Sequence, residues 1–157
     1  MNRLQKRAYD NFLAVTIPSD TRYLHAITNL ASNVGNVAGL DASAARDLST
    51  AVVEAVTNVI DHAYQGAADK VIDIEFHVTP GKLEVHVLHS GLPIDETQIE
   101  PYDPATDPTR LKTRGYGVFL MRHLADRVDY RQTRDGRHEC CLVKYVKEDD
   151  DQSGVSM

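Results

Sequence analysis

The chain has little of what marks secreted, membrane-spanning or nucleic-acid-binding proteins. Only two of its 157 residues are cysteines, and no apolar run approaches the ~18 residues that a membrane-spanning helix needs. Its first residues do not resemble a signal peptide. The formal net charge is −6, and no basic stripe interleaved with aromatic residues is present, so we expect neither a direct nucleic-acid partner nor a membrane partner.

The two cysteines, Cys140 and Cys141, are adjacent. Successive residues of a strand point to opposite faces, so these thiols are not expected to bridge each other. Reduced thiols are typical of the cytoplasm, where we expect the protein to be located. The length suits a single domain, expected over residues 1–147, and the acidic and polar residues at 148–157 predict a flexible tail.

Apolar residues recur at intervals that distinguish strands from helices. Alternation along the chain predicts strands at 12–17, 71–78, 83–89, 128–133 and 140–146. Helical spacing, capping residues and closing glycines predict helices at about 20–37, from 41 or 43 to 66, and at 117–126. The irregular segment 90–114 contains four prolines and predicts a functional lid or a disordered loop. We therefore expect an α/β two-layer sandwich, with a mixed, mainly antiparallel sheet and helices on one face.

The Pro80-Gly81 turn sets the register of the central hairpin. If Thr79 pairs with Lys82, the apolar residues of both strands share one face, which the helices should cover. His89, at the end of the second strand, then points to the buried side of the sheet.

The longest helix carries Glu54, Asn58 and His62 at every fourth position, so these side chains should share one helix face. The opposite stripe is apolar and should pack on the core. Taken alone, the polar residues fit an ordinary amphipathic helix. They also fit an acid–base group beside a ligand for a hard cation.

A second signal is a Gly-x-Gly motif at the start of the last helix, in the run Arg114-Gly115-Tyr116-Gly117-Val118. Glycines at a loop-to-helix junction let the backbone approach an anion, and the free N–H groups of the helix start attract phosphate. Glycine before a helix is also common for geometric reasons alone. Further donors on the lid side are Lys112, Thr113 and Arg114.

In combination, these features predict a phosphoryl-transfer site. Asn58 supplies a neutral oxygen suited to Mg²⁺, an ion that keeps water and substrate phosphates as most of its ligands. Glu54, one turn earlier, can take a proton from an attacking hydroxyl group. The Gly-x-Gly motif would cradle the phosphates.

The order and spacing of these motifs resemble the GHKL ATPases, and specifically the anti-sigma-factor serine/threonine-protein kinases of bacterial partner-switching systems. The run Glu54-x-x-x-Asn58-x-x-x-His62-Ala63-Tyr64 resembles the N-box of that family. Residues 87–93 stand where its first glycine box would be, and residues 114–120 resemble its second glycine box. The resemblance covers roughly residues 12 to 147.

This resemblance implies a Bergerat-type ATP-binding fold that uses ATP and Mg²⁺, with Glu54 as catalytic base and Asn58 as the Mg²⁺ ligand. It also implies a homodimer that binds a sigma factor, holds it inactive, and phosphorylates a serine of a STAS-domain anti-sigma-factor antagonist. The residues expected to bind the nucleotide are Asn58, His62, His89, Gly91, Lys112, Thr113, Arg114, Gly115, Tyr116, Gly117 and Val118.

The first glycine box departs from the family pattern, which carries an aspartate that accepts a hydrogen bond from the adenine amino group. His89 occupies that position here, and Pro93 replaces the second glycine. Neutral imidazole offers one acceptor and one donor, whereas imidazolium offers no acceptor. Adenine could bind more weakly, another base could be accepted, or the pocket could stay empty. The alternative function is therefore a partner-switching module that sequesters proteins with weak or no nucleotide binding. A third possibility, an ATPase domain serving a larger regulatory or chaperone-like machine, is disfavoured by the short chain.

Overall fold

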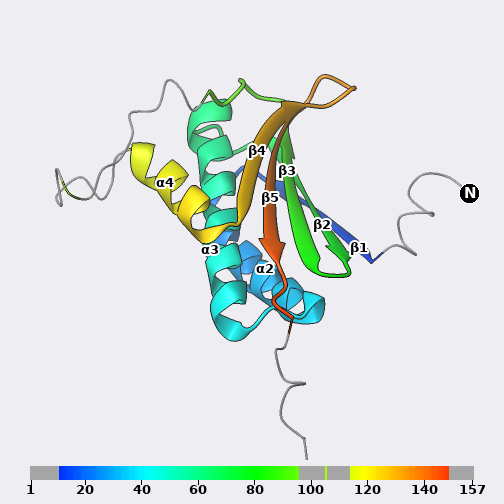
Figure 1. Cartoon of the computed structure of the whole chain (residues 1–157). Helices are drawn as coiled ribbons and strands as arrows, with labels where there is room; N and C mark the ends of the chain where they lie inside the picture. The colour runs from blue at the N-terminus through cyan, green and yellow to red at the C-terminus, as the bar shows by residue number, and fades with distance from the viewer. Residues whose placement is uncertain (1–10, 96–104, 106–113, 149–157) are drawn as a thin grey trace, which may run out of the picture.

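Five strands form one antiparallel sheet, and helices cover one of its two faces (Figure 1). The computed structural model describes residues 11–95, 105 and 114–148. The strand order is β1-β2-β3-β5-β4. The strands are β1 (Phe12–Pro18), β2 (Val71–Thr79), β3 (Lys82–His89), β4 (Arg127–Gln132) and β5 (His138–Tyr145). The expected α/β two-layer sandwich is confirmed, but every described strand pair is antiparallel, so the expectation of a mixed sheet is wrong.

The helical layer consists of a short 3₁₀ turn, three α-helices and one π-helical segment. These elements are η1 (Thr21–Tyr23), α2 (Leu24–Ala38), α3 (Ala42–Asn58), η2 (Val59–Ala63, the π-helical segment) and α4 (Arg114–Leu124). The carboxylate of Asp41 accepts the backbone N–H of Ala44 at 2.8 Å and so caps α3. Gly39 ends α2 in the left-handed region with a φ of 96°, as its place after the helix predicted. α3 packs against both α2 and α4.

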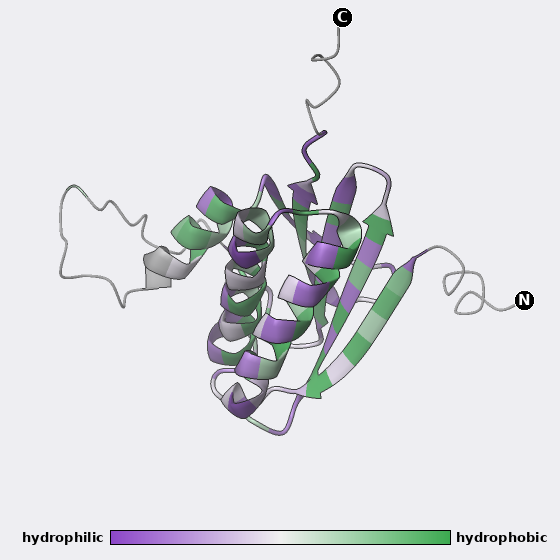
Figure 2. Ribbon diagram, turned by 90° about the horizontal axis from the view of Figure 1, so that it is seen from below, coloured by the Kyte–Doolittle hydropathy of each residue, from purple (hydrophilic) through white to green (hydrophobic). Residues whose placement is uncertain are grey.

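The central hairpin has the predicted register. Thr79 pairs with Lys82, and Phe76 pairs with Val85, so the apolar residues of β2 and β3 share one face. Figure 2 shows the resulting alternation of apolar and polar residues along the strands. This face packs against α2 and α3, and the apolar side chains between the sheet and these helices form the hydrophobic core. His89 is 3% exposed, which confirms that it points to the buried side.

The last described helix begins earlier than predicted. α4 starts at Arg114, so both glycines of the Gly-x-Gly motif lie inside its first turns and not in a preceding loop. Glycine disfavours a helix interior by only about 1 kcal/mol relative to alanine, and tertiary packing outweighs such a preference. Most of the predicted lid, residues 96–104 and 106–113, and the tail from 149 onward lie outside the described residues.

Neither cysteine forms a disulfide, as expected, and both thiols are buried. Cys140 lies in the hydrophobic core between sheet and helices. Cys141 lies on the opposite, helix-free face, where its sulfur is 3.9 Å from Nε2 of His86. Among the described residues, none of the helices has the length and apolar character required to cross a bilayer.

Candidate functional site

Glu54 and Asn58 lie one turn apart on α3, on the side against which α4 packs. A Cβ atom added to Gly117 of α4 would lie 2.8 Å from Oε2 of Glu54 and 3.5 Å from Oδ1 of Asn58. A real Cβ does not approach an oxygen that closely, so a side chain at this position would force the Glu54 carboxylate to shift. The structure thus brings together the carboxylate, the amide and one glycine of the Gly-x-Gly motif, although they are about sixty residues apart in the sequence.

The amide of Asn58 is buried, with 5% of the residue exposed. Its Nδ2 has no hydrogen-bond partner among the described residues. A buried polar group without a partner destabilises a fold by about 1–3 kcal/mol, and such a group is commonly explained by a ligand or a catalytic role. Its amide oxygen is a donor of the hard type that Mg²⁺ prefers, and its N–H₂ group can bind a phosphate oxygen.

Glu54 is half-buried, and its pKa is raised above the ordinary glutamate value. Burial is the main cause, and the nearby negative charge of Asp61 adds to it. A raised pKa makes this carboxylate a stronger base, as a group that must accept a hydroxyl proton near neutral pH requires.

The helix continues beyond Asn58 as a π-helical segment. The backbone N–H of Tyr64 donates to the carbonyl of Val59 at 2.9 Å, which is the i to i+5 spacing of a π-turn. His62 lies in this wider turn and not in α3, so of the three residues only Glu54 and Asn58 share the four-residue spacing of an α-helical face. The sequence gives no signal for this π-turn.

The loop after β3 is fixed to the end of this helix. A Cβ atom on Gly91 would lie 2.5 Å from the carbonyl oxygen of Ala63, and the N–H of Leu92 donates to that oxygen at 2.9 Å. The hydroxyl of Tyr64 accepts the N–H of Ser90 at 3.0 Å and donates to a strand carbonyl at 2.6 Å. The absence of a side chain at Gly91 is therefore required for this close approach.

His89 lies where this loop leaves the sheet. Its Nδ1 accepts a hydrogen bond from the N–H of Gly91 at 3.2 Å. Burial lowers its pKa to about 4, and the neighbouring His138 adds to the shift. The ring contacts Tyr64 edge-on at 5.9 Å between centroids and lies 5.5 Å from the ring of His138. His89 lines a cavity of about 180 Å³ together with Pro93 and a larger cavity of about 680 Å³ on the side of Tyr64.

The remaining predicted residues are placed as follows. Lys112 and Thr113 lie outside the described residues, and Arg114, Gly115 and Tyr116 form the first turn of α4. Val118 is partly buried and packs against the core. The described residues include no cluster of three or more His, Cys, Asp or Glu side chains able to hold a metal ion. A Mg²⁺ site built on Asn58 would therefore take most of its ligands from water and phosphate.

The phosphate half of the site fits a magnesium–nucleotide complex, whereas the base half departs from an adenine site. The buried amide without a partner and the side-chain-free surface of Gly117 suit a metal ion with phosphates. At the other end, the only hydrogen-bond acceptor of neutral His89 is already used by Gly91. The carboxylates of Asp69, Asp73 and Glu139 line the cavities that His89 lines, but His89 itself stands at the position where the family pattern has its aspartate.

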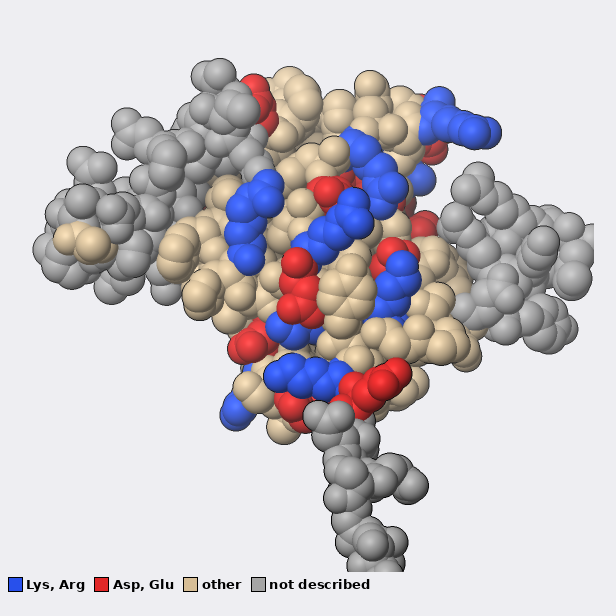
Figure 3. All heavy atoms as spheres, in the orientation of Figure 1, with Lys and Arg blue, Asp and Glu red and all other residues tan. Residues whose placement is uncertain are grey.

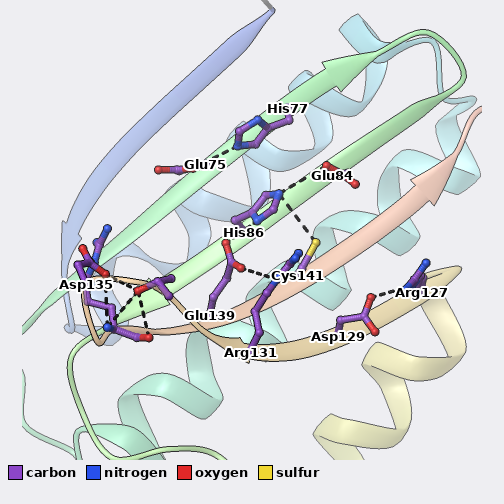
Figure 4. A network of polar contacts seen from close by, with 12 residues as sticks. Glu75, His77, Glu84, His86, Arg127, Asp129, Arg131, Asp135, Glu139 and Cys141 are labelled. Carbon is purple, nitrogen blue, oxygen red and sulfur yellow. Dashed lines mark hydrogen bonds and ion pairs between the residues drawn. The ribbon is translucent and has the colours of Figure 1, made fainter. Parts of the chain in front are cut away.

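A separate polar network covers the helix-free face of the sheet (Figure 4). Nδ1 of His86 lies 2.6 Å from Glu139, and Nε2 lies 3.6 Å from Glu84. Burial opposes protonation of His86, but hydrogen bonds to Cys141 and Glu139 outweigh it and raise its pKa to about 10. Arg131 pairs with Glu139 at 2.6 Å. Figure 3 shows acidic and basic side chains interspersed over one side of the molecule, so charges of both signs are available to a partner surface there.

Comparison with known proteins places the chain among kinases. The family profile described as "Histidine kinase-like ATPase domain" matches residues 17–144. The serine-protein kinase RsbW of Listeria innocua is 31% identical over 140 residues, which cover 87% of this chain and 88% of that protein. The serine-protein kinase RsbW of Oceanobacillus iheyensis is 29% identical over 153 residues, covering 92% and 95% of the two chains.

Two solved structures share the fold. The structure of the SiaB–SiaC complex from Pseudomonas aeruginosa has a chain with a TM-score of 0.59 and 14% identity, and the match covers 92% of this chain and 98% of that one. The structure of the RsbU and RsbW domains of a Mycobacterium tuberculosis protein gives a TM-score of 0.57 and 14% identity, covering 85% of this chain and 31% of that longer one.

Proposed function

The chain belongs to the histidine kinase-like ATPase family and, within it, to the serine-protein kinase RsbW family, and from that premise we propose that it is an anti-sigma factor with serine-kinase activity. It would bind a sigma factor and phosphorylate a serine of a STAS-domain antagonist. The phosphoryl donor would be a magnesium–nucleoside triphosphate, and ATP is the nucleotide that the family implies. The observation that supports this most strongly is the meeting of Glu54, Asn58 and Gly117 at one point between α3 and α4.

Each of these residues has a task in phosphoryl transfer. Glu54, whose pKa is raised by burial, would accept the proton of the attacking serine hydroxyl. The oxygen of Asn58 would hold Mg²⁺, and the N–H groups in the first turn of α4 would bind phosphate oxygens. When bound, the magnesium nucleotide supplies the phosphoryl group and the positive charge that balances it in the transition state.

The partners and the location are part of the same proposal. Binding of a sigma factor and of a STAS-domain antagonist, homodimerisation and action in the cytoplasm are supported by the family. The two cysteines form no disulfide, which is consistent with a reducing compartment. The chain that shares the fold in Pseudomonas aeruginosa was solved as a complex with another protein, SiaC.

The base assignment is tested by replacing Glu54 with glutamine, which keeps the size of the side chain and removes its basicity. We expect phosphoryl transfer to a STAS-domain antagonist to fall by about 10²- to 10⁴-fold, with nucleotide binding retained. The control is Asp47→Asn, which makes the same kind of change nearer the start of α3 and should leave transfer unchanged. Undiminished transfer by Glu54→Gln would reject the assignment.

A second candidate function is a module that sequesters its protein partners without phosphoryl transfer. His89 favours this possibility, because it withholds the acceptor that adenine needs. The two functions differ in a simple measurement. A kinase incubated with antagonist and labelled nucleotide labels the antagonist, whereas a sequestering module binds the sigma factor and leaves the antagonist unlabelled.

A further inference from the structure

Cys141, His86 and Glu139 form a line of three polar side chains on the helix-free face of the sheet (Figure 4). Sγ of Cys141 lies 3.9 Å from Nε2 of His86, and Nδ1 of the same ring lies 2.6 Å from Oε1 of Glu139. The pairing of β3 with β5 sets His86 directly opposite Cys141. A thiol, an imidazole and a carboxylate in this order are the arrangement by which proteins activate a cysteine as a nucleophile.

The imidazole of His86 holds a proton that makes it positive. Burial opposes this charge, but the hydrogen bonds and the negative charges of Cys141 and Glu139 outweigh burial and raise the pKa of His86 to about 10. A cysteine contributes a negative charge only as its thiolate. At neutral pH the two side chains are therefore an imidazolium and a thiolate, with Nε2–H of the ring directed at the sulfur.

Arg131 of β4 adds a second positive charge beside the same sulfur. Burial opposes the charge of Arg131, but the negative charges of Glu139 and Cys141 outweigh it and raise the pKa of the guanidinium. Positive surroundings of this kind distinguish reactive cysteines from inert ones. One group acts against them, because Oε2 of Glu84 lies 3.6 Å from Nε2 of His86 and competes for its N–H.

The adjacent Cys140 has different surroundings. It points to the opposite face of the sheet and lies in the hydrophobic core under the helices. Its cross-strand neighbours are Val87 and Tyr130, whereas those of Cys141 are His86 and Asp129. The chain thus contains its own reference thiol, one residue away, for any reactivity assigned to Cys141.

Access to Cys141 is limited by side chains and not by a helix. The residue is only 1% exposed, but the described helices all lie on the other face of the sheet (Figure 1). The side chain of Arg131 is 54% exposed, and surface side chains change rotamer within nanoseconds. The cavities of about 180 and 680 Å³ described above include neither Cys141 nor His86. A reagent little larger than water fits this position better than an organic substrate.

We propose that Cys141 is a modification site that reacts with hydrogen peroxide, with His86 as the proton donor. The thiolate sulfur attacks one peroxide oxygen, so that an S–O bond forms while the O–O bond breaks. The leaving hydroxide takes the proton from Nε2 of His86 and departs as water. Sulfur loses two electrons and becomes a sulfenic acid, and the peroxide is reduced by the same two electrons.

The reaction changes the cluster without changing its net charge. A thiolate and an imidazolium become a sulfenic acid and a neutral imidazole, so one ion pair is lost from the helix-free face. A sulfenic acid is reversible, because a thiol converts it to a disulfide that a further thiol reduces. Cys140 points to the other face and cannot supply that thiol, so reversal requires a thiol from solution.

The rate of sulfenic-acid formation tests the proposal. The chain has only two cysteines, so Cys140→Ala leaves Cys141 as the single thiol and Cys141→Ala leaves Cys140. Each protein is incubated at pH 7 with hydrogen peroxide and dimedone, which traps sulfenic acids, and labelling is followed by intact mass. Cys141 should be labelled about tenfold faster in the folded protein than in urea, because an ordinary cysteine is only a few per cent thiolate at pH 7. Cys140 should be labelled more slowly in the folded protein than in urea.

Two substitutions in the Cys140→Ala protein should act in opposite directions. His86→Gln removes the proton donor and its charge, so labelling should slow by about tenfold. Glu84→Gln removes the competing carboxylate, so labelling should accelerate by about twofold or more. The control His25→Gln, on the exposed part of α2, should leave the rate unchanged.

Three results would overturn the proposal. They are labelling of Cys141 that is no faster in the folded protein than in urea, equal labelling of the two cysteines in the folded proteins, and undiminished labelling of His86→Gln. If His86→Gln does not fold, the comparison of folded and unfolded Cys141 and the Glu84→Gln rate decide. Phosphoryl transfer takes no part in these measurements, so their failure leaves the proposed function untouched.

Discussion

A Cβ atom on Gly117 would lie 2.8 Å from Oε2 of Glu54, so α4 meets the carboxylate of α3 with no side chain between them. This contact joins two motifs that are distant in the sequence. It also gives a reason for glycine at a position inside a helix, where it is intrinsically unfavourable. The first prediction follows from it.

Gly117→Ala should push either the carboxylate or the start of α4 out of place. We expect binding of the magnesium nucleotide and phosphoryl transfer each to fall by about tenfold or more, because small displacements at a reacting centre are costly. The double variant Glu54→Ala/Gly117→Ala removes the atom that the new methyl group meets. Nucleotide binding should recover in the double variant, measured by calorimetry, although transfer should not. Equal loss of binding in both variants would show that Glu54 is not the obstructing group.

Asn58→Ala should separate stability from ligand binding. The buried Nδ2 has no hydrogen-bond partner among the described residues, so its removal relieves an unfavourable group but loses some packing. The free energy of unfolding should therefore change by less than about 1 kcal/mol. The stabilisation that Mg²⁺ and nucleotide give to the wild type should disappear, because Asn58 is the proposed protein ligand of the metal. Thermal melting with and without magnesium nucleotide measures both effects. Asn29→Ala, an exposed amide on α2, is the control and should keep the full ligand-induced shift. A strongly destabilised Asn58→Ala protein would instead assign the amide a structural role.

The sequence predicts the framework of this site better than its details. Alternating apolar residues and the Pro80-Gly81 turn determine the hairpin register, and that register correctly buries His89. The π-turn after Asn58 could not be predicted, because the i to i+5 hydrogen bond of Tyr64 leaves no pattern of residue types.

Other features depend on contacts between distant segments. The start of α4 was predicted too late because glycine is a poor helix former, and only the packing of Gly117 against Glu54 explains its place in a helix. The network around His86 depends on the pairing of β3 with β5, which sets His86 opposite Cys141. Single-residue patterns carry no information on such pairs. The hydrogen bond that fixes the tautomer of His89 is likewise visible only in three dimensions.

Because of the network on the helix-free face, the free energy of unfolding should fall as the pH rises into the alkaline range. His86 has a pKa of about 10 in the folded protein and about 6.5 when unfolded, so the folded state binds the extra proton between these values. Its stabilisation is fully present below pH 6.5 and is lost as the pH rises toward 10. The groups facing it are Glu84, Glu139, Cys141, Arg131 and the ring of His77.

Chemical denaturation at pH 6 and pH 9.5 tests this dependence. The wild type should lose about 2 kcal/mol of unfolding free energy over this range, a value reduced from the full shift because part of the network reaches solvent. His86→Gln should abolish most of the loss, because glutamine does not titrate. His25→Gln, on the exposed part of α2, should behave as the wild type does. A wild-type profile that is flat over this range would contradict the charged state assigned to His86.

Because of His89, the free energy of unfolding should fall as the pH falls into the acidic range, the opposite direction to the effect of His86. Its pKa is about 4 in the folded protein and about 6.5 when unfolded, so the unfolded state binds a proton first as the pH falls. The stabilisation is fully present above pH 6.5 and is lost as the pH falls from 6.5 toward 4. Among the described residues, the ring contacts Tyr64, His138 and the N–H of Gly91. The carboxylates of Asp69, Asp73 and Glu139 line the same cavities, but His138 is the charged neighbour that shifts the pKa of His89. We expect the wild type to lose about 1–3 kcal/mol of unfolding free energy between pH 6.5 and pH 4.5.

His89→Asn should remove that part of the loss and leave the contribution of the other groups in place. The same pH dependence in wild type and His89→Asn would mean that His89 has the same pKa in the folded and unfolded states, which would contradict the lowered pKa.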